Sequence, residues 1–364
     1  SGDTKNQPFL FLWEGVTGSA PSSVVTVNST GDSADNNPGD HSCDTGGTVG
    51  ADPECTLRAA IEEANASGIV DTIEFDIPTT DSGYSASPLS YTIQVGVPST
   101  EILPAITEPV TIDGTSQPDF PGTPIIVLDG TAATTIDTNG ITLEAGSSTI
   151  SGLSIVDFPD DAIELDILGG NRIAGNYIGV LPDGTTAPGN GWGIAIKTSG
   201  NTIGGTVAAD RNVIAGNSNY GLAVYNGAAS NLVQGNFIGV AAGGSAAAGN
   251  GTNGIEIYDG ANNNTIGGST TAHGTVISSN TGYGIDIYGA GTDSNTVSAN
   301  YIGLDAAGTT DRGNGSDGVA IRSGAQSNTV GGLTVGERNY VAGNDNDGVW
   351  ITGSGTDFNV VQGN

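Results

Sequence analysis

Short segments of alternating apolar residues recur along the chain from residue 140 onwards. Each begins with a small residue, as in GIEI at 254 and GIDI at 284. A period of two predicts strands, and the Gly and Asn residues every few positions exclude a helix here. We refer to these segments as strand words, and they begin at residues 140, 162, 193, 221, 254, 284, 318 and 348.

The strand words belong to a longer repeat. GNYIGV at 175 returns as GNFIGV at 235 and ANYIGL at 299, and NTIGG at 201 returns at 264 and, as NTVGG, at 328. Each unit therefore holds three short strands, which is too little to bury an apolar face alone. Coils stacked about 4.8 Å apart would pair each strand with those above and below it and form a continuous core. The sequence predicts an all-β fold, a parallel β-helix with three strands per coil.

Asparagine supports this stacking. An Asn that opens the second strand of each coil can turn its amide inward and bond the amides above and below. This ladder is predicted from Asn171, Asn201, Asn231, Asn264, Asn295, Asn328 and Asn359, with Ser148 in the coil before. A second column at the next corner comprises Asn176, Asn212, Asn236, Asn300 and Asn339, with Thr275 in between. Long insertions beginning at 180, 240 and 304 should hang outside the core at one corner.

Charge and cysteine content limit the binding partners that the chain can have and the bonds that its two cysteines can form. With 8 basic and 39 acidic residues the net charge is −31, which argues against binding to nucleic acid or anionic lipid. The apolar runs, such as FLFLW at 9–13, are too short for a membrane span. Cys43 and Cys55 could close a disulfide worth roughly 3 kcal/mol, the alternative being two free thiols. No cofactor is required, although acidic turns at Asp160, Asp161, Asp345 and Asp347 could hold Ca²⁺ or be merely solvated.

One amphipathic helix is predicted near the N-terminus, in DPECTLRAAIEEANASG. Asp52 could cap it, Gly68 would follow its end, and Leu57, Ile61 and Ala64 lie on its apolar stripe with Ala60. We expect residues 1–68 to form an N-terminal segment with a disulfide-pinned capping helix. Residues 69–364 should form the β-helix, with regular coils from about 139.

This region also carries a resemblance. CTLRAAIEEANAS, followed by PVTIDGTSQP at 109 and VLDGT at 127, resembles the secreted bacterial right-handed parallel β-helix repeat proteins of pectate-lyase-like architecture that have an N-terminal CSLREA motif. The matching positions are Cys55, Leu57, Arg58, Ala60 and Ile61. Thr56 replaces Ser and Ala59 replaces Glu. The resemblance implies a right-handed coil and an extracellular or cell-surface location, and such proteins are of undemonstrated activity.

Outward positions of the strand words should form columns across the coils. The first column is Thr142, Glu164, Ala195, Ala223, Glu256, Asp286, Ala320 and Trp350. The second column, two positions later, is Glu144, Asp166, Lys197, Tyr225, Tyr258, Tyr288, Arg322 and Thr352. Their middle coils combine stacked tyrosines, two cations and adjacent carboxylates.

Two interpretations of these columns stay open. The ligand-binding candidates for a surface glycan are Tyr225, Tyr258, Tyr288, Lys197 and Arg322. Glu256 and Asp286 could act as the carboxyl pair of a glycosidase, whereas cross-strand packing alone also favours outward tyrosines. We expect a structural or adhesive solenoid, more readily a non-enzyme than an enzyme. The alternative is a polysaccharide lyase or glycoside hydrolase of the β-helix type.

The C-terminal end raises a question about partners. The last repeat has no helix or polar coil after it, whereas the N-terminal end has a predicted capping helix. We therefore expect either further coils beyond residue 364 or end-to-end stacking on another copy. In the second case the FLFLW segment could serve as a cover or as an added strand.

Overall fold

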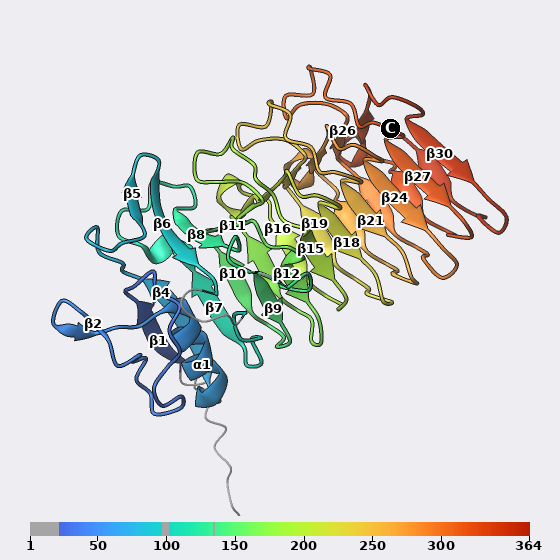
Figure 1. The fold of residues 1–364 in the computed structure, drawn as a ribbon. Helices are drawn as coiled ribbons and strands as arrows, with labels where there is room; N and C mark the ends of the chain where they lie inside the picture. Colours follow the sequence, from blue (N-terminus) through green and yellow to red (C-terminus); the bar gives the residue numbers. More distant parts are fainter. Residues whose placement is uncertain (1–21, 97–101, 134) are drawn as a thin grey trace, which may run out of the picture.

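The chain forms a right-handed parallel β-helix with a short N-terminal capping helix, as predicted (Figure 1). The computed structural model describes residues 22–96, 102–133 and 135–364. Within them, three sheets run along the solenoid, and each coil passes through the eight-, eleven- and ten-stranded sheet in that order. Strands three apart in the chain are paired, as in β12–β15–β18.

The sheets comprise the following strands. The eight-stranded sheet is β9 (Ile141–Leu143), β12 (Asp161–Leu165), β15 (Trp192–Ile196), β18 (Leu222–Val224), β21 (Ile255–Ile257), β24 (Ile285–Tyr288), β27 (Val319–Arg322) and β30 (Val349–Thr352). The eleven-stranded sheet is β1 (Ser22–Val27), β4 (Val70–Phe75), β7 (Val110–Asp113), β10 (Thr149–Ser151), β13 (Arg172–Ala174), β16 (Thr202–Gly204), β19 (Leu232–Gln234), β22 (Thr265–Gly267), β25 (Thr296–Ser298), β28 (Thr329–Gly331) and β31 (Val360–Gln362). The ten-stranded sheet is β5 (Tyr84–Ala86), β6 (Leu89–Gln94), β8 (Ile126–Asp129), β11 (Leu153–Val156), β14 (Tyr177–Ile178), β17 (Val213–Ile214), β20 (Phe237–Ile238), β23 (Val276–Ile277), β26 (Tyr301–Ile302) and β29 (Tyr340–Val341).

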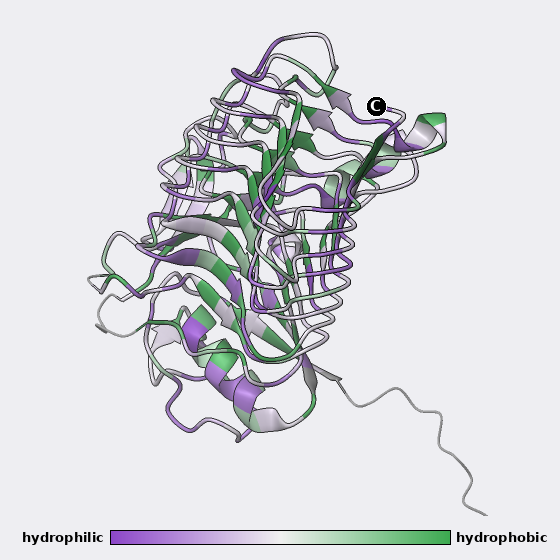
Figure 2. Cartoon of the chain, turned by 90° about the vertical axis from the view of Figure 1, so that its right-hand side faces the viewer, coloured by the Kyte–Doolittle hydropathy of each residue, from purple (hydrophilic) through white to green (hydrophobic). Residues whose placement is uncertain are grey.

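A few elements lie outside these sheets. They are the hairpin of β2 (Thr48–Val49) with β3 (Asp52–Pro53), the helix α1 (Leu57–Ser67), and the 3-10 turns η1 (Gly114–Ser116), η2 (Ala208–Asp210), η3 (Thr271–His273) and η4 (Val335–Glu337). Figure 2 shows the apolar residues concentrated in the strands, with polar residues in many of the connecting loops.

Vertical stacks of apolar side chains form the core. Ile163, Ile194 and Leu222 are paired neighbours on three successive strands, and all three are fully buried. The strand words thus place one apolar stripe on the inside of every coil, because alternate side chains of a strand point to opposite faces. Burying this stripe is the main favourable contribution to stacking.

The predicted asparagine ladders are present. In the first, the backbone N–H of each Asn donates to Oδ1 of the next, as from Asn171 to Asn201 at 2.9 Å and from Asn201 to Asn231 at 2.8 Å. The second has the same arrangement, for example from Asn176 to Asn212 at 3.0 Å. These bonds satisfy buried polar groups at the corners, where no strand pairing is available.

A third ladder escaped the sequence analysis. It runs through Asn190, Asn217, Asn250, Asn280, Asn314 and Asn344, at the corner that leads into the eight-stranded sheet. The signal for it is a GN pair at 189, 216, 249, 313 and 343. Variable insertions before this corner hide the regular spacing, and therefore the pattern is less obvious than that of the other ladders.

The insertions do more than hang outside the core. They fold against the outer face of the ten-stranded sheet, where small apolar clusters gather around Tyr177 and around Phe237. Successive insertions also bond to one another, because Ala242 N donates to Gly184 O and Ala306 N to Gly244 O, at 2.9 and 2.8 Å. The insertions are therefore a packed outer layer.

Helix α1 begins later than the capping rule suggested. Its N-cap is Thr56, whose hydroxyl accepts the N–H of Ala59, while Asp52 is paired in the β2–β3 hairpin instead. Strand pairing with β2 thus replaces the expected cap at Asp52, which is a correction to the sequence-based assignment. Gly68 ends the helix in the left-handed region at φ 65°, as expected.

The polar residues of the CTLRAAIEEAN motif hold the N-terminal region together. The guanidinium of Arg58 bonds both carboxylate oxygens of Asp32 at 3.0 and 2.8 Å and the carbonyl of Ile102 at 2.7 Å, and the Arg58 and Asp32 side chains are buried. Glu63 accepts two backbone N–H groups at 2.6 Å from residues 39 and 41. The motif is therefore accounted for by structure, with no polar residue directed to an open site.

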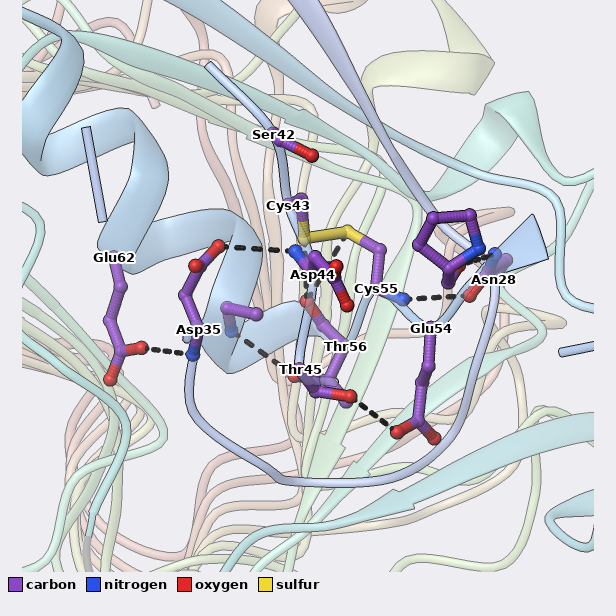
Figure 3. The surroundings of a disulfide bond; sticks show 12 residues. Asn28, Asp35, Ser42, Cys43, Asp44, Thr45, Glu54, Cys55, Thr56 and Glu62 are labelled. Carbon is purple, nitrogen blue, oxygen red and sulfur yellow. Dashed lines mark hydrogen bonds between the residues drawn. A yellow bond between two sulfur atoms is a disulfide. The ribbon is translucent and has the colours of Figure 1, made fainter. Parts of the chain in front are cut away.

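The predicted disulfide joins Cys43 and Cys55, with 5.2 Å between their Cα atoms (Figure 3). Around it, Asp35 accepts the N–H of Asp44, and Glu62 accepts the N–H of Asp35. Carboxylates thus organise a segment that has little regular secondary structure, because they satisfy backbone groups that a sheet would otherwise pair.

The last coil has an exposed inner face. Ile351 is 39% exposed, whereas its paired neighbour Ile321 in the preceding coil is fully buried, and Phe358 is 80% exposed. Stacking of this end on another coil stays a prediction. The FLFLW segment proposed as its cover lies outside the described residues.

Candidate functional site

The outward columns form as predicted on the eight-stranded sheet. In the first column Glu164 pairs with Ala195, Ala223 with Glu256, and Glu256 with Asp286. In the second column Tyr288 pairs with Arg322. The tyrosines, the two cations and the carboxylates that the sequence singled out therefore lie on one continuous face.

The tyrosines of the second column stack on one another. The ring centroids of Tyr225 and Tyr258 are 5.1 Å apart at 11° between planes, and those of Tyr258 and Tyr288 are 5.4 Å apart at 2°. The Arg322 guanidinium lies 4.4 Å above the Tyr288 ring on one end, and Trp192 lies 6.2 Å from Tyr225 at the other. Each ring of the stack therefore has neighbours above and below it along the solenoid.

We call Asn253, Glu256, Asp286 and Arg322 the C-terminal acid cluster. Arg322 bonds both oxygens of Asp286 at 3.0 and 2.7 Å, and Asn253 donates its amide to Glu256. The Glu256 carboxyl also raises the pKa of the Tyr220 and Tyr288 hydroxyls near it, although burial is the larger cause. Glu256 is only 3% exposed and Asp286 fully buried.

Burial controls the electrostatics of this cluster. Desolvation raises the pKa of both carboxyls, while the Asn253 bond at Glu256 and the Arg322 bonds at Asp286 act in the opposite direction. The hydrogen bond to Asp286 also raises the pKa of Arg322. Every carboxylate here has a hydrogen-bond donor from the chain itself.

We call Asp161, Glu164, Asp166 and Lys197 the N-terminal acid cluster. Lys197 forms ion pairs with Glu164 and with Asp166, the latter at 3.0 Å. Burial lowers the pKa of Lys197, but the hydrogen bonds to Glu164 and Asp166 outweigh it, so that the pKa is raised overall. The amide of Asn139 adds a 2.8 Å hydrogen bond to Glu164.

A third column, at the corner just before each strand word, was missed by the sequence analysis. It consists of the one residue that precedes each strand word. These residues are Asn139, Asp161, Trp192, Tyr220, Asn253, Tyr283, Asp317 and Asp347. Three of its members, Asn139, Asn253 and Asp317, accept a backbone N–H group from the next coil. Asn139 accepts from Asp161 at 3.1 Å and Asp317 from Asp347 at 2.7 Å.

Asp161 departs from this rule. Its side chain is buried, with 5% exposure, and its Oδ1 has no hydrogen-bond partner in the described part of the chain. The N–H of Trp192, which would be its partner in the column, donates to the carbonyl of Asp160 instead, at 3.1 Å. Burial, and then the charges of Asp160 and Glu164, raise the pKa of Asp161 to about 8.

The acidic turns show no metal-binding arrangement. Among the residues that the structure describes, no group of three or more His, Cys, Asp or Glu side chains is placed to hold a metal ion. Asp345 and Asp347 lie exposed at the last corner, and Asp160 is half-buried beside Asp161. Calcium binding by Asp160, Asp161, Asp345 and Asp347 stays a prediction.

A cleft of 260 Å³ lies at the corner between the ten- and eight-stranded sheets. It is lined by residues from three successive coils, among them Pro159, Gly191, Ser218 and Asn219. Pro159 lies two residues before Asp161, and Gly191 directly before Trp192. Neither Asp161 nor Trp192 is among the residues that line the cleft.

Comparison with known proteins leaves the family open. No protein-family model and no curated protein matches this chain. The CSLREA-type family membership therefore stays a prediction. In the described residues, no helix has both the length and the apolar character needed to cross a membrane.

Solved structures of two epimerases and of one catalytic domain show distant similarity. The A-module of the Azotobacter vinelandii mannuronan C-5 epimerase AlgE6 is 15% identical, over 85% of this chain and 94% of its own, with a TM-score of 0.35. The periplasmic alginate epimerase AlgG is 14% identical, over 80% and 71%, with a TM-score of 0.34. The Agl-KA catalytic domain is 14% identical, over 84% and 54%, with a TM-score of 0.38. The fold rests on the strand pairing itself, and these similarities assign no role to any residue.

Proposed function

We propose that this chain is a structural or adhesive β-solenoid of the cell exterior, whose eight-stranded face is stiffened by mutual contacts between its side chains. The observation that supports this proposal most strongly is that the side chains of the second column contact one another. Tyr225, Tyr258 and Tyr288 lie between other rings or the Arg322 guanidinium. A sugar ring that packs on an aromatic residue needs a free ring face, and stacking removes that face from the middle of this column.

The carboxylates support the same proposal. Glu256 and Asp286 accept hydrogen bonds from Asn253 and Arg322, and they are buried beneath the side chains around them. A catalytic carboxyl has to reach the scissile bond of its substrate within hydrogen-bond distance. In this arrangement the substrate would first have to displace side chains that already satisfy the acids.

An exported location is part of the proposal. A disulfide such as Cys43–Cys55 persists in oxidising compartments and is rare in reducing ones. The strong negative charge suits a soluble exterior surface. Intact-mass analysis of the protein from its source, before and after reduction, tests this point, and two free thiols in the native protein would contradict it.

A polysaccharide lyase or hydrolase is the second candidate, favoured by one observation. Glu256 and Asp286 are paired neighbours on adjacent strands, which lie about 4.8 Å apart. That spacing is close to the roughly 5 Å between the carboxyls of retaining glycosidases. Burial raises the pKa of both groups, which suits the proton donor of such a pair but not its ionised nucleophile.

A polysaccharide-degradation screen separates the two candidates. Neutral and uronic-acid polysaccharides are incubated with the whole chain, and released reducing ends or unsaturated products are measured. The structural proposal predicts no turnover by the natural sequence. Turnover that is abolished in a folded Glu256→Gln variant would establish the enzyme instead. Asp317→Asn, on the same face but outside both acid clusters, serves as the matched control.

A further inference from the structure

One turn of the solenoid exposes two large apolar residues side by side. Ile167 is 58% exposed and Leu168 is 56% exposed, in the turn that leads from β12 of the eight-stranded sheet to β13 of the eleven-stranded sheet. At the same place the other coils carry small or polar residues, such as Thr198 and Ser199 in the next coil. A single exposed apolar residue needs no explanation, but an adjacent pair at an otherwise polar position indicates a contact surface.

A cleft lies beside this pair. Its volume is 500 Å³, which is within the range of ligand pockets in proteins. Leu168 lines it together with Pro109 and Ala145, and its polar lining residues include Thr107 and Ser147. These residues come from three successive coils, just before the strands β7, β10 and β13. The exposed pair therefore adjoins a partly apolar hollow at the corner where the strands of the eleven-stranded sheet begin.

The sequence contains an apolar segment that could fill this hollow. FLFLW at 9–13 is the longest run of apolar residues in the chain, and exposing such a run to water is unfavourable. Residues 14–21, which read EGVTGSAP, connect it to β1. Their Gly, Ser and Pro content is typical of a linker rather than of a strand or helix. The segment is thus a candidate occupant that is covalently attached close to the cleft.

The start of β1 lies at the same corner as the cleft, because Ser23, Asp71 and Val110 are paired across β1, β4 and β7. The strands β7, β10 and β13 are two to four places from β1 in the sheet, which corresponds to about 10 to 19 Å along the solenoid. The eight residues 14–21 can span at most about 28 Å. The segment 9–13 can therefore reach the cleft of its own chain.

The other exposed apolar surface is too distant for this segment. Strand β31 of the last coil is ten places from β1 in the same sheet, or about 48 Å away. This distance exceeds the span of residues 14–21, so that the segment could cover Phe358 or Ile351 only on another copy of the chain. Reach thus separates a contact within one chain from end-to-end stacking.

We propose that residues 9–13 bind in the cleft bordered by Ile167 and Leu168 of the same chain. The contact covers the exposed apolar pair and joins the segment before β1 to the first regular coils. It goes beyond the proposed structural role and does not depend on it, because neither Ile167 nor Leu168 belongs to an acid cluster. Burial of apolar side chains is its driving force.

The test is fluorine NMR of the whole chain labelled with fluorotryptophan. Trp13 is the reporter, assigned by the loss of its resonance in Trp13→Phe, and Trp192 and Trp350 report on the fold. In the natural sequence the Trp13 resonance should differ from its position in the denatured chain. It should also stay in place over about a hundredfold dilution, because a contact within one chain does not depend on concentration. In the double variant Ile167→Ser with Leu168→Ser it should move to the denatured position, while the other two resonances stay unchanged.

The matched control is the double variant Leu333→Ser with Val335→Ser. These residues form another exposed apolar pair, at the corner between the eleven- and ten-stranded sheets. They follow β28, nine places from β1, or about 43 Å away and out of reach of the segment. The control should leave the Trp13 resonance in place, which shows that removing exposed apolar residues elsewhere has no such effect.

Three results would overturn the proposal. The first is a Trp13 resonance that already has its denatured position in the natural sequence. The second is a Trp13 resonance that does not respond to Ile167→Ser with Leu168→Ser. The third is a resonance that changes on dilution and responds to Phe358→Ser instead, because the segment would then bind the last coil of another copy.

Discussion

The N-terminal and C-terminal acid clusters are built on the same plan, yet they differ at one corner. In each, a first-column carboxylate is paired with a cation from the next coil, Glu164 with Lys197 and Asp286 with Arg322. At the third column the C-terminal cluster has Asn253, which donates to its neighbouring acid, whereas the N-terminal cluster has Asp161. The carboxylates of one cluster are therefore satisfied within the chain, whereas the buried Oδ1 of Asp161 in the other has no hydrogen-bond partner in the described part of the chain.

The difference shows what a stacked fold does to carboxyl groups. Stacked coils bring carboxyl groups from distant parts of the sequence into contact. Whether each carboxyl stabilises or destabilises the fold then depends on the hydrogen-bond donors that the next coil provides. Where donors suffice, as at Asp286, the acids help to fix the coil register. Where they do not, as at Asp161, burial of the unpartnered acid destabilises the fold.

The largest effect is expected from breaking the C-terminal cluster. Arg322→Ala leaves Asp286 buried without its cation and should lower the free energy of unfolding by about 3 kcal/mol. Denaturant unfolding measures the change in the free energy of unfolding. Hydrogen exchange of the amides in β24 and β27 shows whether the destabilisation is located at these strands. Lys197→Ala is the control, with a loss under about 1 kcal/mol, because the Asp166 carboxylate reaches solvent. Equal losses in the two variants would contradict the comparison.

A single substitution should convert the C-terminal cluster into a copy of the other. Asn253→Asp removes the amide donor of Glu256 and places a second carboxyl beside Glu256. We expect a loss of about 2 kcal/mol at pH 8, and a smaller loss at pH 5, where the new acid can be protonated and donate. Thermal unfolding at the two pH values measures this. A loss that is independent of pH would indicate a packing effect only.

The reverse substitution should stabilise the N-terminal cluster. Asp161 has a folded-state pKa of about 8 against an ordinary value of 3.8, so that the folded chain holds this proton more tightly than the unfolded chain. Its contribution is therefore most favourable below about pH 4 and is lost as the pH rises towards 8. Asp161→Asn should be more stable than the natural sequence by about 1 to 2 kcal/mol at pH 8, with a flatter dependence on pH. A gain that is the same at pH 4 and pH 8 would contradict the assigned titration.

The smallest effect concerns the tyrosine stack between the clusters. Tyr258→Leu removes two ring contacts but keeps an apolar side chain, and it should cost about 1 kcal/mol. Tyr258→Phe keeps both ring contacts and serves as the control, with little change. Denaturant unfolding compares the two, and a larger loss in the Phe variant would mean that the hydroxyl rather than the stack carries the contribution.

Much of this fold can be predicted from sequence because its rules are local. Period-two words place Ile163 and Ile194 inside, and inward Asn amides mark two of the three corners. The first two outward columns follow from the same words. The cap of helix α1 could not be predicted, because Asp52 satisfies the capping rule but pairs with β2 instead.

The candidate site was less accessible to sequence analysis. The sequence grouped Glu256 and Asp286 with the tyrosines, but the number of donors around each acid depends on rotamers and on the next coil. The special position of Asp161 depends on one backbone choice, namely that the N–H of Trp192 bonds the carbonyl of Asp160. No pattern in the sequence predicts this backbone hydrogen bond.

The central claim is that a buried acid stabilises this fold only where the chain supplies it with hydrogen-bond donors. The most direct measurement is the thermal midpoint of the natural chain, of Asp161→Leu and of Arg322→Ala at pH 8. We predict a higher midpoint for Asp161→Leu and a lower midpoint for Arg322→Ala. A lower midpoint for Asp161→Leu, or a higher one for Arg322→Ala, would contradict the claim.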